Sequence, residues 1–412
     1  MLDSSYPTPP GADGAARLLG LDEGMDLRQR GSLVELNRAL HRLWGLGRNF
    51  VLGWSPAGND LLLLVVPHYG IADYALLHEA ELEAGHDFLA RLLSGSRRYT
   101  ASQLERAARL LGSEPIRLPL RQPLTGDEAE IRIVDDLVRR YGVSYSASRA
   151  VALFDIVGFS LLSPFEQMTQ LNSLSYSLNA AHSKMLEGRM HIDFARSGTG
   201  DGFYVWNRKV DENADLHLYH FMHLVLADNA IARGKAHGRT VPLLRAGFHV
   251  GSCYEFYHAE GLNPTLFTDI VGQVTIELAR IVENAMPGQI LVAEFLTAPA
   301  DSPPLHEPDT VDAVSFVDRA QHNLSQLNGL ELSGDDIESI KCYLTGSARA
   351  DGSFSIRKLA IYDKHGLTRN AFNAKVNIYR RAADPILLGI EDRLLRNKRF
   401  RAPEPVDQAT DH

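Results

Sequence analysis

The sequence predicts an α+β protein in which helices cover a mixed β-sheet. Three observations lead to this fold class. The chain has 412 residues, of which 45% are hydrophobic and 23% charged, a composition typical of folded proteins with more than one domain. Segments of helical and strand-like hydrophobic period alternate along it. A glycine-rich turn near residue 200 joins two strand-like segments into a hairpin, so the sheet cannot be wholly parallel.

The first third of the chain predicts a small α+β module behind a tail. Residues 1–14 are polar and rich in Pro and Gly, which indicates a mobile tail. Residues 15–112 form the module, which would be sensory, dimerising or merely stabilising. Its expected elements are a helix at 32–46, strands at 50–54 and 61–66, and helices within 75–93 and 101–111.

A connector and one amphipathic helix follow at residues 113–146. Three prolines within 113–128 indicate an irregular connector. Apolar residues at helical spacing in 131–141 then predict a helix that leads into the next strand. Transmission of a signal and simple packing of the two modules are both consistent with such a helix.

Residues 147–300 predict the main domain. An apolar strand that carries Asp155 opens it, and Ser163, Pro164 and Glu166 then give the pattern of a helix N-terminus with a capping box. The remaining expected elements are a hairpin at 191–208, a helix after it, a strand at 243–251, a helix at 273–284 and a strand at 289–295.

Residues 301–412 predict a C-terminal α/β extension. A proline-containing linker comes first, followed by a helix at 312–328 and β-like segments at 353–363 and 371–379. A last helix and a basic tail at 393–403 end the sequence. Short basic tails of this kind are usually solvated.

Charge and cysteine content limit the function classes. The formal net charge of -9 argues against a nucleic-acid partner, because such binding needs a basic surface. The two cysteines, Cys253 and Cys342, fit a reducing compartment, and we expect a cytoplasmic protein. The apolar run at 61–66 is far shorter than the roughly 20 residues of a membrane-spanning helix, so no membrane span is expected.

Two acidic residues stand in unusual settings. Asp155 lies in an otherwise apolar strand, and a buried carboxylate is costly unless it is paired or binds a metal. Asp201 lies between glycines in the hairpin turn, and sheet pairing could bring it next to Asp155. Two converging carboxylates favour hard divalent cations such as Mg²⁺ or Mn²⁺. For each acid taken alone, ordinary turn chemistry is the more common explanation.

Four blocks of sequence resemble the class III nucleotidyl cyclases, the catalytic domains of adenylyl and guanylyl cyclases. ALFDIVGFS is similar to the first metal-binding strand of that family, TGDGFYVW to its metal-binding hairpin and RAGFHVG to its R-x-G-x-H-x-G strand. DIVGQVTIELARIVENAMPGQILV aligns without gaps with the segment that starts at the base-reading acid. The resemblance covers about residues 147–296 and implies a ferredoxin-like core with covering helices.

The resemblance implies a role for individual residues. It implies a nucleoside triphosphate substrate, a cyclic nucleotide product, two divalent cations (Mg or Mn), and a homodimer with shared active sites. The metal ligands would be Asp155, Asp201 and the carbonyl of Ile156. Phe159 and Ser160 would donate backbone hydrogen bonds to phosphates, Asp269 would read the base, and Arg280 would stabilise charge on the α-phosphate.

Two departures from the family pattern leave the substrate open. Ser197 stands where the family has its purine-reading lysine, and Ile276, flanked by Thr275 and Glu277, stands where it has its catalytic asparagine. An active cyclase that uses ATP, or a pyrimidine nucleotide as in bacterial anti-phage signalling, is the first hypothesis. A nucleotide-binding regulatory module without turnover and a different phosphoryl-transfer enzyme on the same core are the alternatives.

A run of histidines gives a weaker signal. His217, His220 and His223 are three residues apart, a spacing that drifts around a helix instead of stacking on one face. This predicts a helix surface or an interface in preference to a metal site.

Overall fold

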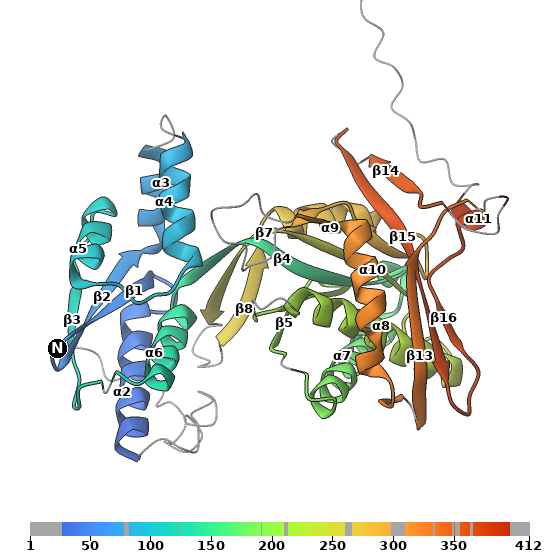
Figure 1. Cartoon of the computed structure of the whole chain (residues 1–412), viewed down its shortest axis with the longest axis horizontal. Helices are drawn as coiled ribbons and strands as arrows, with labels where there is room; N and C mark the ends of the chain where they lie inside the picture. Colours follow the sequence, from blue (N-terminus) through green and yellow to red (C-terminus); the bar gives the residue numbers. More distant parts are fainter. Residues whose placement is uncertain are drawn as a thin grey trace, which may run out of the picture. The chain divides into compact units, whose positions relative to one another are not determined.

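The computed structural model describes residues 27–77, 82–124, 126–190, 192–209, 213–259, 266–297, 310–332, 334–347, 350, 355–362 and 366–395. The chain forms two compact units. The first comprises Met1–Ser146 and Tyr254–Ile270, and the second comprises Ala147–Cys253 and Val271–His412. The elements of both are labelled in Figure 1. The expected tail at 1–14 and the basic tail at 393–403, apart from its first three residues, lie outside the described residues.

The first unit has a small antiparallel sheet with the strand order β1-β2-β3. Residues of β2 alternate between two cores: Leu61 and Leu63 pack with α2 and α6, whereas Leu64 and Val66 pack with α4 and α5. Strand β3 lies in the expected connector, which is therefore partly regular. The elements are α2 (Leu27–Trp44), β1 (Asn49–Ala57), β2 (Asp60–Pro67), α3 (His68–Leu77), α4 (Leu82–Ser94), α5 (Ala101–Leu110), β3 (Ile116–Pro119) and α6 (Glu128–Arg140).

The expected elements of the main domain are present. Ser163 accepts from the backbone of Glu166 and Glu166 accepts from Ser163, so α7 starts with the predicted capping box. The elements are β4 (Val143–Ile156), the 3₁₀ turn η2 (Phe159–Leu161), α7 (Pro164–Glu187), β5 (Phe194–Gly198), β6 (Gly202–Asn207), α8 (Ala214–Lys235), β7 (Leu244–Ala259), β8 (Leu266–Val271), α9 (Gln273–Glu283), β9 (Ile290–Ala293) and β10 (Leu296–Thr297).

The C-terminal segment joins the same sheet. Strand β15 pairs with β9 on one side and with β13 on the other, and the order is β12-β13-β15-β9-β7-β4-β6-β5. The mixed sheet expected from the hairpin is confirmed, since β7 and β9 are parallel and β4 and β6 antiparallel. The added elements are β11 (Val311–Asp312), α10 (Ala313–Asn323), η3 (Leu324–Leu327), β12 (Glu331–Leu332), β13 (Asp335–Leu344), β14 (Lys358–Tyr362), β15 (Thr368–Arg380), β16 (Ile386–Leu388) and α11 (Asp392–Leu395).

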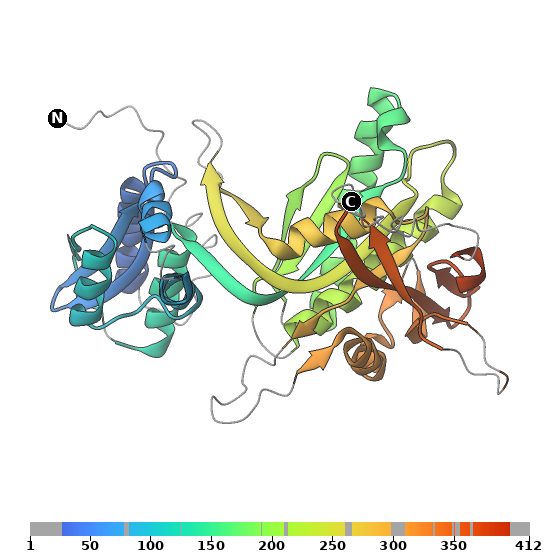
Figure 2. The same cartoon turned by 90° about the horizontal axis from the view of Figure 1, so that it is seen from above.

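Helices cover both faces of this sheet. Ile290 and Val292 of β9 point into the large core formed with α7, α8 and α10, whereas Leu291 and Ala293 point into a smaller core with Ile281 of α9. Figure 2 shows the long curved strands β4 and β7 side by side, with α9 and α8 on either side of the sheet. The end of β4 and the start of α9 are thus fixed by the same sheet.

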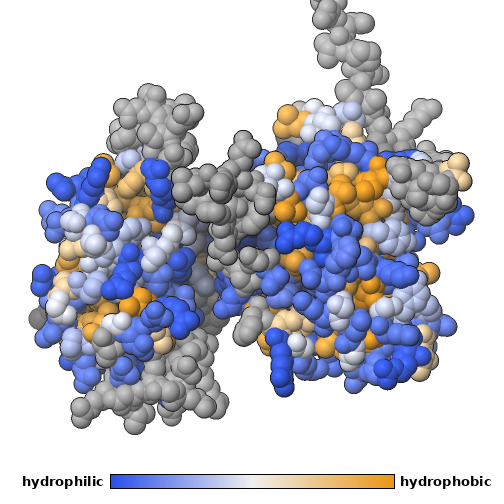
Figure 3. Space-filling view, viewed as in Figure 1, coloured by the Kyte–Doolittle hydropathy of each residue, from blue (hydrophilic) through white to orange (hydrophobic). Residues whose placement is uncertain are grey.

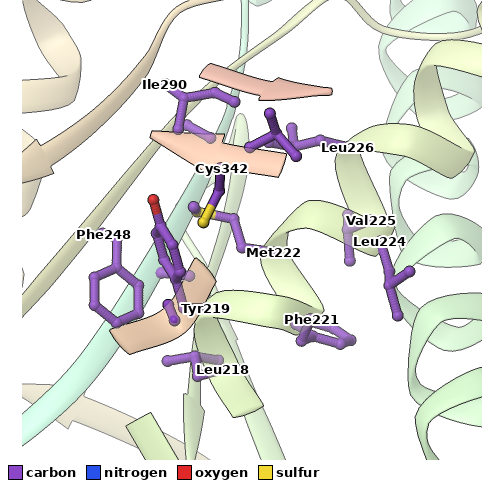
Figure 4. Packing of buried hydrophobic residues seen from close by; sticks show 14 of the residues in the cluster. Leu218, Tyr219, Phe221, Met222, Leu224, Val225, Leu226, Phe248, Ile290 and Cys342 are labelled. Atoms are coloured by element: carbon purple, nitrogen blue, oxygen red, sulfur yellow. The ribbon is translucent and has the colours of Figure 1, made fainter. Parts of the chain in front are cut away.

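Helix α8 is a core helix, and the expected exposed or interfacial position of its histidines is wrong for two of them. His220 and His223 are fully buried, and burial lowers the pKa of His220 to about 4 and that of His223 well below its usual value. Figure 4 shows Tyr219 of this helix between Phe248 and Cys342. The three-residue spacing drifts around the helix as expected, but α8 is enclosed by sheet, α7 and α10.

The surface is mainly hydrophilic on the face drawn in Figure 3, with smaller hydrophobic groups between the polar ones. Within the described part of the chain, no helix has the length and apolarity that crossing a membrane requires.

Candidate functional site

The two acids proposed from the sequence lie on neighbouring strands. Asp155 is near the end of β4 and pairs in register with Gly202 of β6, so that Asp201 follows directly at the hairpin turn. The backbone N–H of Ile156 donates to the carbonyl of Asp201 at 3.0 Å. A Cβ on Gly202 would lie 1.9 Å from the carbonyl oxygen of Phe154, so only glycine lets the strands approach this closely.

Arg245 neutralises Asp155 in this structure. The guanidinium Nε donates to Asp155 Oδ2 at 2.5 Å, and Nη1 donates to the carbonyls of Glu283 and Ala285 at 2.9 and 3.3 Å. Arg245 stands near the start of β7, next to β4 in the sheet. It therefore links the acid strand to the C-terminal end of α9.

Burial is the main influence on the Asp155 carboxyl. Desolvation raises its pKa above the ordinary value, the hydrogen bond and charge of Arg245 oppose this rise, and the Asp201 charge adds to it. The net direction is upward. A desolvated carboxylate beside a second carboxylate is an arrangement that a bound cation would relieve.

A tight loop connects the acid strand to α7. Gly158 has a φ of +70°, which glycine adopts at little cost, and it precedes the 3₁₀ turn with Phe159 and Ser160. Gln167 of α7 donates to the carbonyl of Phe159 at 3.1 Å and so fixes the loop against the helix. The loop is therefore held in place directly beyond Asp155.

Tyr204 of β6 connects the acids to α9. Its hydroxyl donates to the carbonyl of Thr275 at 3.1 Å. Burial raises the Tyr204 pKa, the Arg280 charge lowers it, and the Asp155 and Asp201 charges raise it further. The charges of Arg280, Asp155 and Asp201 of the same chain thus all act on the Tyr204 hydroxyl.

Helix α9 presents the remaining candidates in different settings. Thr275 is buried and its hydroxyl donates to the Gly272 carbonyl at 3.0 Å, so its side chain closes the helix start. Ile276 is 57% exposed although it is apolar. Arg280 lies 3.6 Å from Glu283 one turn on.

Glu277, named only as a neighbour of Ile276, is the centre of a polar network. Its carboxylate accepts from His249 Nε2 at 2.9 Å and from Gln273 Nε2 at 3.1 Å, and it pairs with Arg369 Nη1 at 2.9 Å. These contacts, led by the His249 hydrogen bond, lower the Glu277 pKa to about 2. Since Arg369 belongs to β15, the C-terminal segment holds the same helix that carries Arg280.

Ser197 and its neighbour Arg196 point to opposite faces of β5, as successive strand residues do. Arg196 donates to Ser175 and Asn179 of α7 at 3.1 and 3.4 Å and lies over the Phe203 ring. Arg196 is therefore engaged with α7 and does not take the role of the lysine that the resemblance expects at position 197.

Asp269 is in the first unit, on β8. Its carboxylate lies 3.2 Å from His258 Nδ1, an ion pair when that histidine is protonated, and the His258 ring stacks on Phe267. The Asp269 side chain is 35% exposed, so solvent still reaches it.

The donor set limits which metal site is feasible. Among the described residues, no group of three or more His, Cys, Asp and Glu side chains is arranged to hold a metal ion. The oxygen atoms available at this place are those of the Asp155 and Asp201 carboxylates and of nearby main-chain carbonyls, including that of Ile156. Hard cations that keep several water ligands fit such a set, whereas zinc in a closed site does not.

Sequence reasoning gave no role to three residues of the site: Arg245, Tyr204 and Glu277. Arg245 had a usable signal, because it is the first residue of the R-x-G-x-H-x-G block and a guanidinium there can reach an acid on the adjacent strand. For Tyr204 and Glu277 the sequence offered no signal apart from their positions in the blocks that resemble the cyclases. Their partners Thr275 and Arg369 are distant in sequence, by 71 residues for the first pair.

No protein-family model matches the sequence, and no curated protein matches it. A comparison of structures does find cyclase domains. The guanylate cyclase domain of RhGC from Catenaria anguillulae in complex with GTP is 12% identical, with a TM-score of 0.33, and the match covers 58% of this chain and 99% of that one.

Two further matches are shorter. The guanylyl cyclase Cya2 is 17% identical over 41% of this chain and 90% of its own, with a TM-score of 0.29. The adenylyl cyclase CyaB from P. aeruginosa is 14% identical over 41% of this chain and 93% of its own, with a TM-score of 0.28. Because these identities and TM-scores are low, only the residues of this chain can support a function for it.

Proposed function

We propose that the protein is a nucleotidyl cyclase that converts a nucleoside triphosphate into a 3′,5′-cyclic monophosphate and pyrophosphate. The observation that carries the proposal is the juxtaposition of Asp155 and Asp201 at neighbouring strand ends, beside the Gly158 turn that leads into Phe159 and Ser160. Acid pairs, phosphate-facing backbone and a guanidinium are the parts that displacement at phosphorus needs.

In the proposed reaction the ribose 3′-oxygen forms a bond to the α-phosphorus while the bond from that phosphorus to the bridging oxygen breaks. Pyrophosphate leaves, and the hydroxyl proton passes to solvent. Asp155, Asp201 and the Ile156 carbonyl would hold two Mg²⁺ or Mn²⁺ ions, which supply activation of the hydroxyl and neutralisation of the triphosphate. Phe159 and Ser160 would orient phosphate oxygens through their N–H groups.

Arg280 would stabilise the negative charge that grows on the α-phosphate. The hydroxyl of Tyr204 holds the backbone of α9 at Thr275, five residues before Arg280, and so helps to orient the guanidinium. The order β7-β4-β6-β5, with α7 and α8 in the connections, supports the ferredoxin-like core that this arrangement implies.

The residues near the proposed base position leave two classes of nucleobase as candidates. Asp269 would accept from an exocyclic amine, which adenine and cytosine both carry. Ser197 offers a short hydroxyl where a lysine would otherwise reach a purine. ATP and a pyrimidine triphosphate are therefore both proposed substrates, the latter as in anti-phage signalling, with cyclic AMP, cyclic CMP or cyclic UMP as products.

A homodimer with shared sites is part of the proposal, in which one protomer gives Asp155 and Asp201 and the other gives Asp269 and Arg280. Mixing Asp155→Asn and Arg280→Ala proteins under conditions that exchange subunits should restore about a quarter of wild-type activity, because one of four statistical site combinations is intact. No recovery in exchanged heterodimers would contradict shared sites.

A nucleotide-binding regulatory module without turnover is a second candidate. The observation that favours it is Ile276, an exposed apolar side chain at the position where the resemblance requires a hydrogen-bonding asparagine. In this role the two acids and Arg280 would bind a triphosphate without catalysing its cyclisation.

Incubation of the full-length protein with each of ATP, GTP, CTP and UTP in Mn²⁺ and in Mg²⁺ tests the proposal. A cyclic monophosphate and pyrophosphate in equal amounts, identified by mass spectrometry, are expected from at least one of them. Binding of a triphosphate without product would favour the regulatory module, and a linear or transferred product would favour another phosphoryl-transfer enzyme.

A further inference from the structure

The first unit contains a surface groove of about 400 Å³ between α2 and the β3 region. Its apolar walls come from Leu36, Ala39, Leu118, Pro119 and Leu120. Its volume lies within the range of about 300–1,000 Å³ that is usual for small-molecule sites. Every lining residue belongs to the first unit, so the groove is separate from the acids on β4 and β6.

The side chains that line this groove include more positive than negative charges. Arg121 is paired with Glu35 at 2.9 Å, which leaves Arg38 and Arg42. Within the described part of the chain, neither of these two side chains makes an ion pair or a hydrogen bond. The groove therefore carries a net charge of two positive units in a protein whose overall charge is -9.

The spacing of the two arginines is itself unfavourable for folding. Arg38 and Arg42 are four residues apart on α2, on the same side of the helix, where like charges repel each other and destabilise the helix. Leu36 and Ala39, which also line the groove, are buried and hold α2 against the unit. Two guanidinium groups directed to one groove without a carboxylate between them are suited to an anion.

We propose that this groove binds a small molecule that carries a phosphate group on an apolar or aromatic part. Guanidinium groups match phosphate oxygens with paired hydrogen bonds, and two uncompensated positive charges match a phosphate dianion. The leucine walls would contact the apolar part. The limited volume and the acidic protein as a whole favour a small molecule over a nucleic acid.

Isothermal titration of the full-length protein with phenyl phosphate tests this site. This probe has the phosphate and an aromatic ring but is not a nucleotide, so it separates the groove from the proposed cyclase site. Saturable binding of one equivalent per chain is expected, with weaker binding of inorganic phosphate. Absence of phenyl phosphate binding, or equal affinity for citrate or a short RNA, would overturn the proposal.

Substitutions of the groove arginines test whether phenyl phosphate binds in this groove. Arg38→Gln with Arg42→Gln should lower the phenyl phosphate affinity about tenfold or more, since each lost charge-assisted pair is worth over 1 kcal/mol. Arg106→Gln with Arg109→Gln, on exposed positions of α5 in the same unit, makes the same change in net charge and should leave the affinity unchanged. Equal losses in both double variants would show a general charge effect and reject the groove.

Folding of the variants is followed independently by circular dichroism. If the Arg38/Arg42 double variant unfolds, each single substitution is titrated, and each should lower affinity by about threefold or more. A single variant that is folded and binds phenyl phosphate as tightly as the wild type would also overturn the assignment. Cyclase activity plays no part in these readouts, so failure of the proposed function leaves the test intact.

Discussion

Asp155 and Glu277 are two carboxylates of the same unit in opposite electrostatic situations. Asp155 has one arginine partner and a second acid nearby, and burial raises its pKa. Glu277 has a histidine, a glutamine and an arginine around it, and its pKa falls to about 2. The charge of Asp155 therefore costs folding free energy, whereas the charge of Glu277 stabilises the fold. The difference agrees with the binding role proposed for the first and gives the second a structural role.

Asp155→Asn should have the largest effect of the substitutions at these two carboxylates. We expect cyclic nucleotide formation to fall by about 100-fold or more, because the amide is a poor ligand for hard cations. The free energy of unfolding at neutral pH should stay within about 1 kcal/mol of wild type or rise. Asp193→Asn, an exposed change at the base of the same hairpin, is the matched control. A folded, fully active Asp155→Asn protein would contradict the proposed role.

Arg245→Ala should have the next largest effect, which is a decrease in the free energy of unfolding. It leaves Asp155 buried without its partner and frees the carbonyls of Glu283 and Ala285, so we expect a loss of about 2–3 kcal/mol in urea denaturation. In the double variant with Asp155→Asn the loss should be smaller, since no charge is stranded. Equal losses in both backgrounds would show that the ion pair is not the cause.

Glu277→Gln tests how the stability contributed by this carboxylate depends on pH. The pKa of Glu277 is lowered on folding, so its stabilisation is complete above about pH 4.5 and is lost as the pH falls toward 2. After allowance for solvent screening of a partly exposed pair, we expect about 1–2 kcal/mol. The variant should lose this amount at neutral pH and little at pH 2. Glu187→Gln, which alters an exposed pair with Lys184, should change neither value measurably.

The contribution of Asp155 to stability should change with pH in the opposite direction to that of Glu277. Its folded pKa is raised, so the wild-type protein loses stability relative to Asp155→Asn as the pH rises through that pKa. Denaturation curves of the two proteins between pH 4 and pH 7 measure the difference. A wild-type protein that gains stability relative to the variant over this interval would contradict the upward shift.

Arg369→Gln should have the smallest effect. It removes one of three partners of Glu277 and should cost about 1 kcal/mol of stability. Because Arg369 acts through α9, we expect kcat to fall by less than tenfold while the KM for the triphosphate changes little, with partial rescue in Arg369→Lys. A loss of affinity with unchanged kcat would indicate that Arg369 contacts the nucleotide instead.

Several local features could be predicted from the sequence because their causes are local. The capping box of α7 needs only Ser163 and Glu166, and the hairpin that ends in Asp201 needs only its glycines and alternating residues. A helix after the hairpin was likewise expected, but burial of His220 and His223 was not. That burial depends on α10, whose Ala320 carbonyl lies 3.2 Å from His220 Nε2, 100 residues away.

The sequence by itself determined the α+β class, most element positions and the two acids that suggest metal chemistry. Tertiary structure alone decided that Arg245 neutralises Asp155, that Tyr204 holds α9, and that β13 and β15 extend the sheet and bring Arg369 to Glu277. Local features could be predicted because hydrophobic period and capping depend on neighbours a few residues apart. Strand pairing and the partners of buried charges depend on contacts between residues separated by about 70–90 positions, which no local pattern specifies.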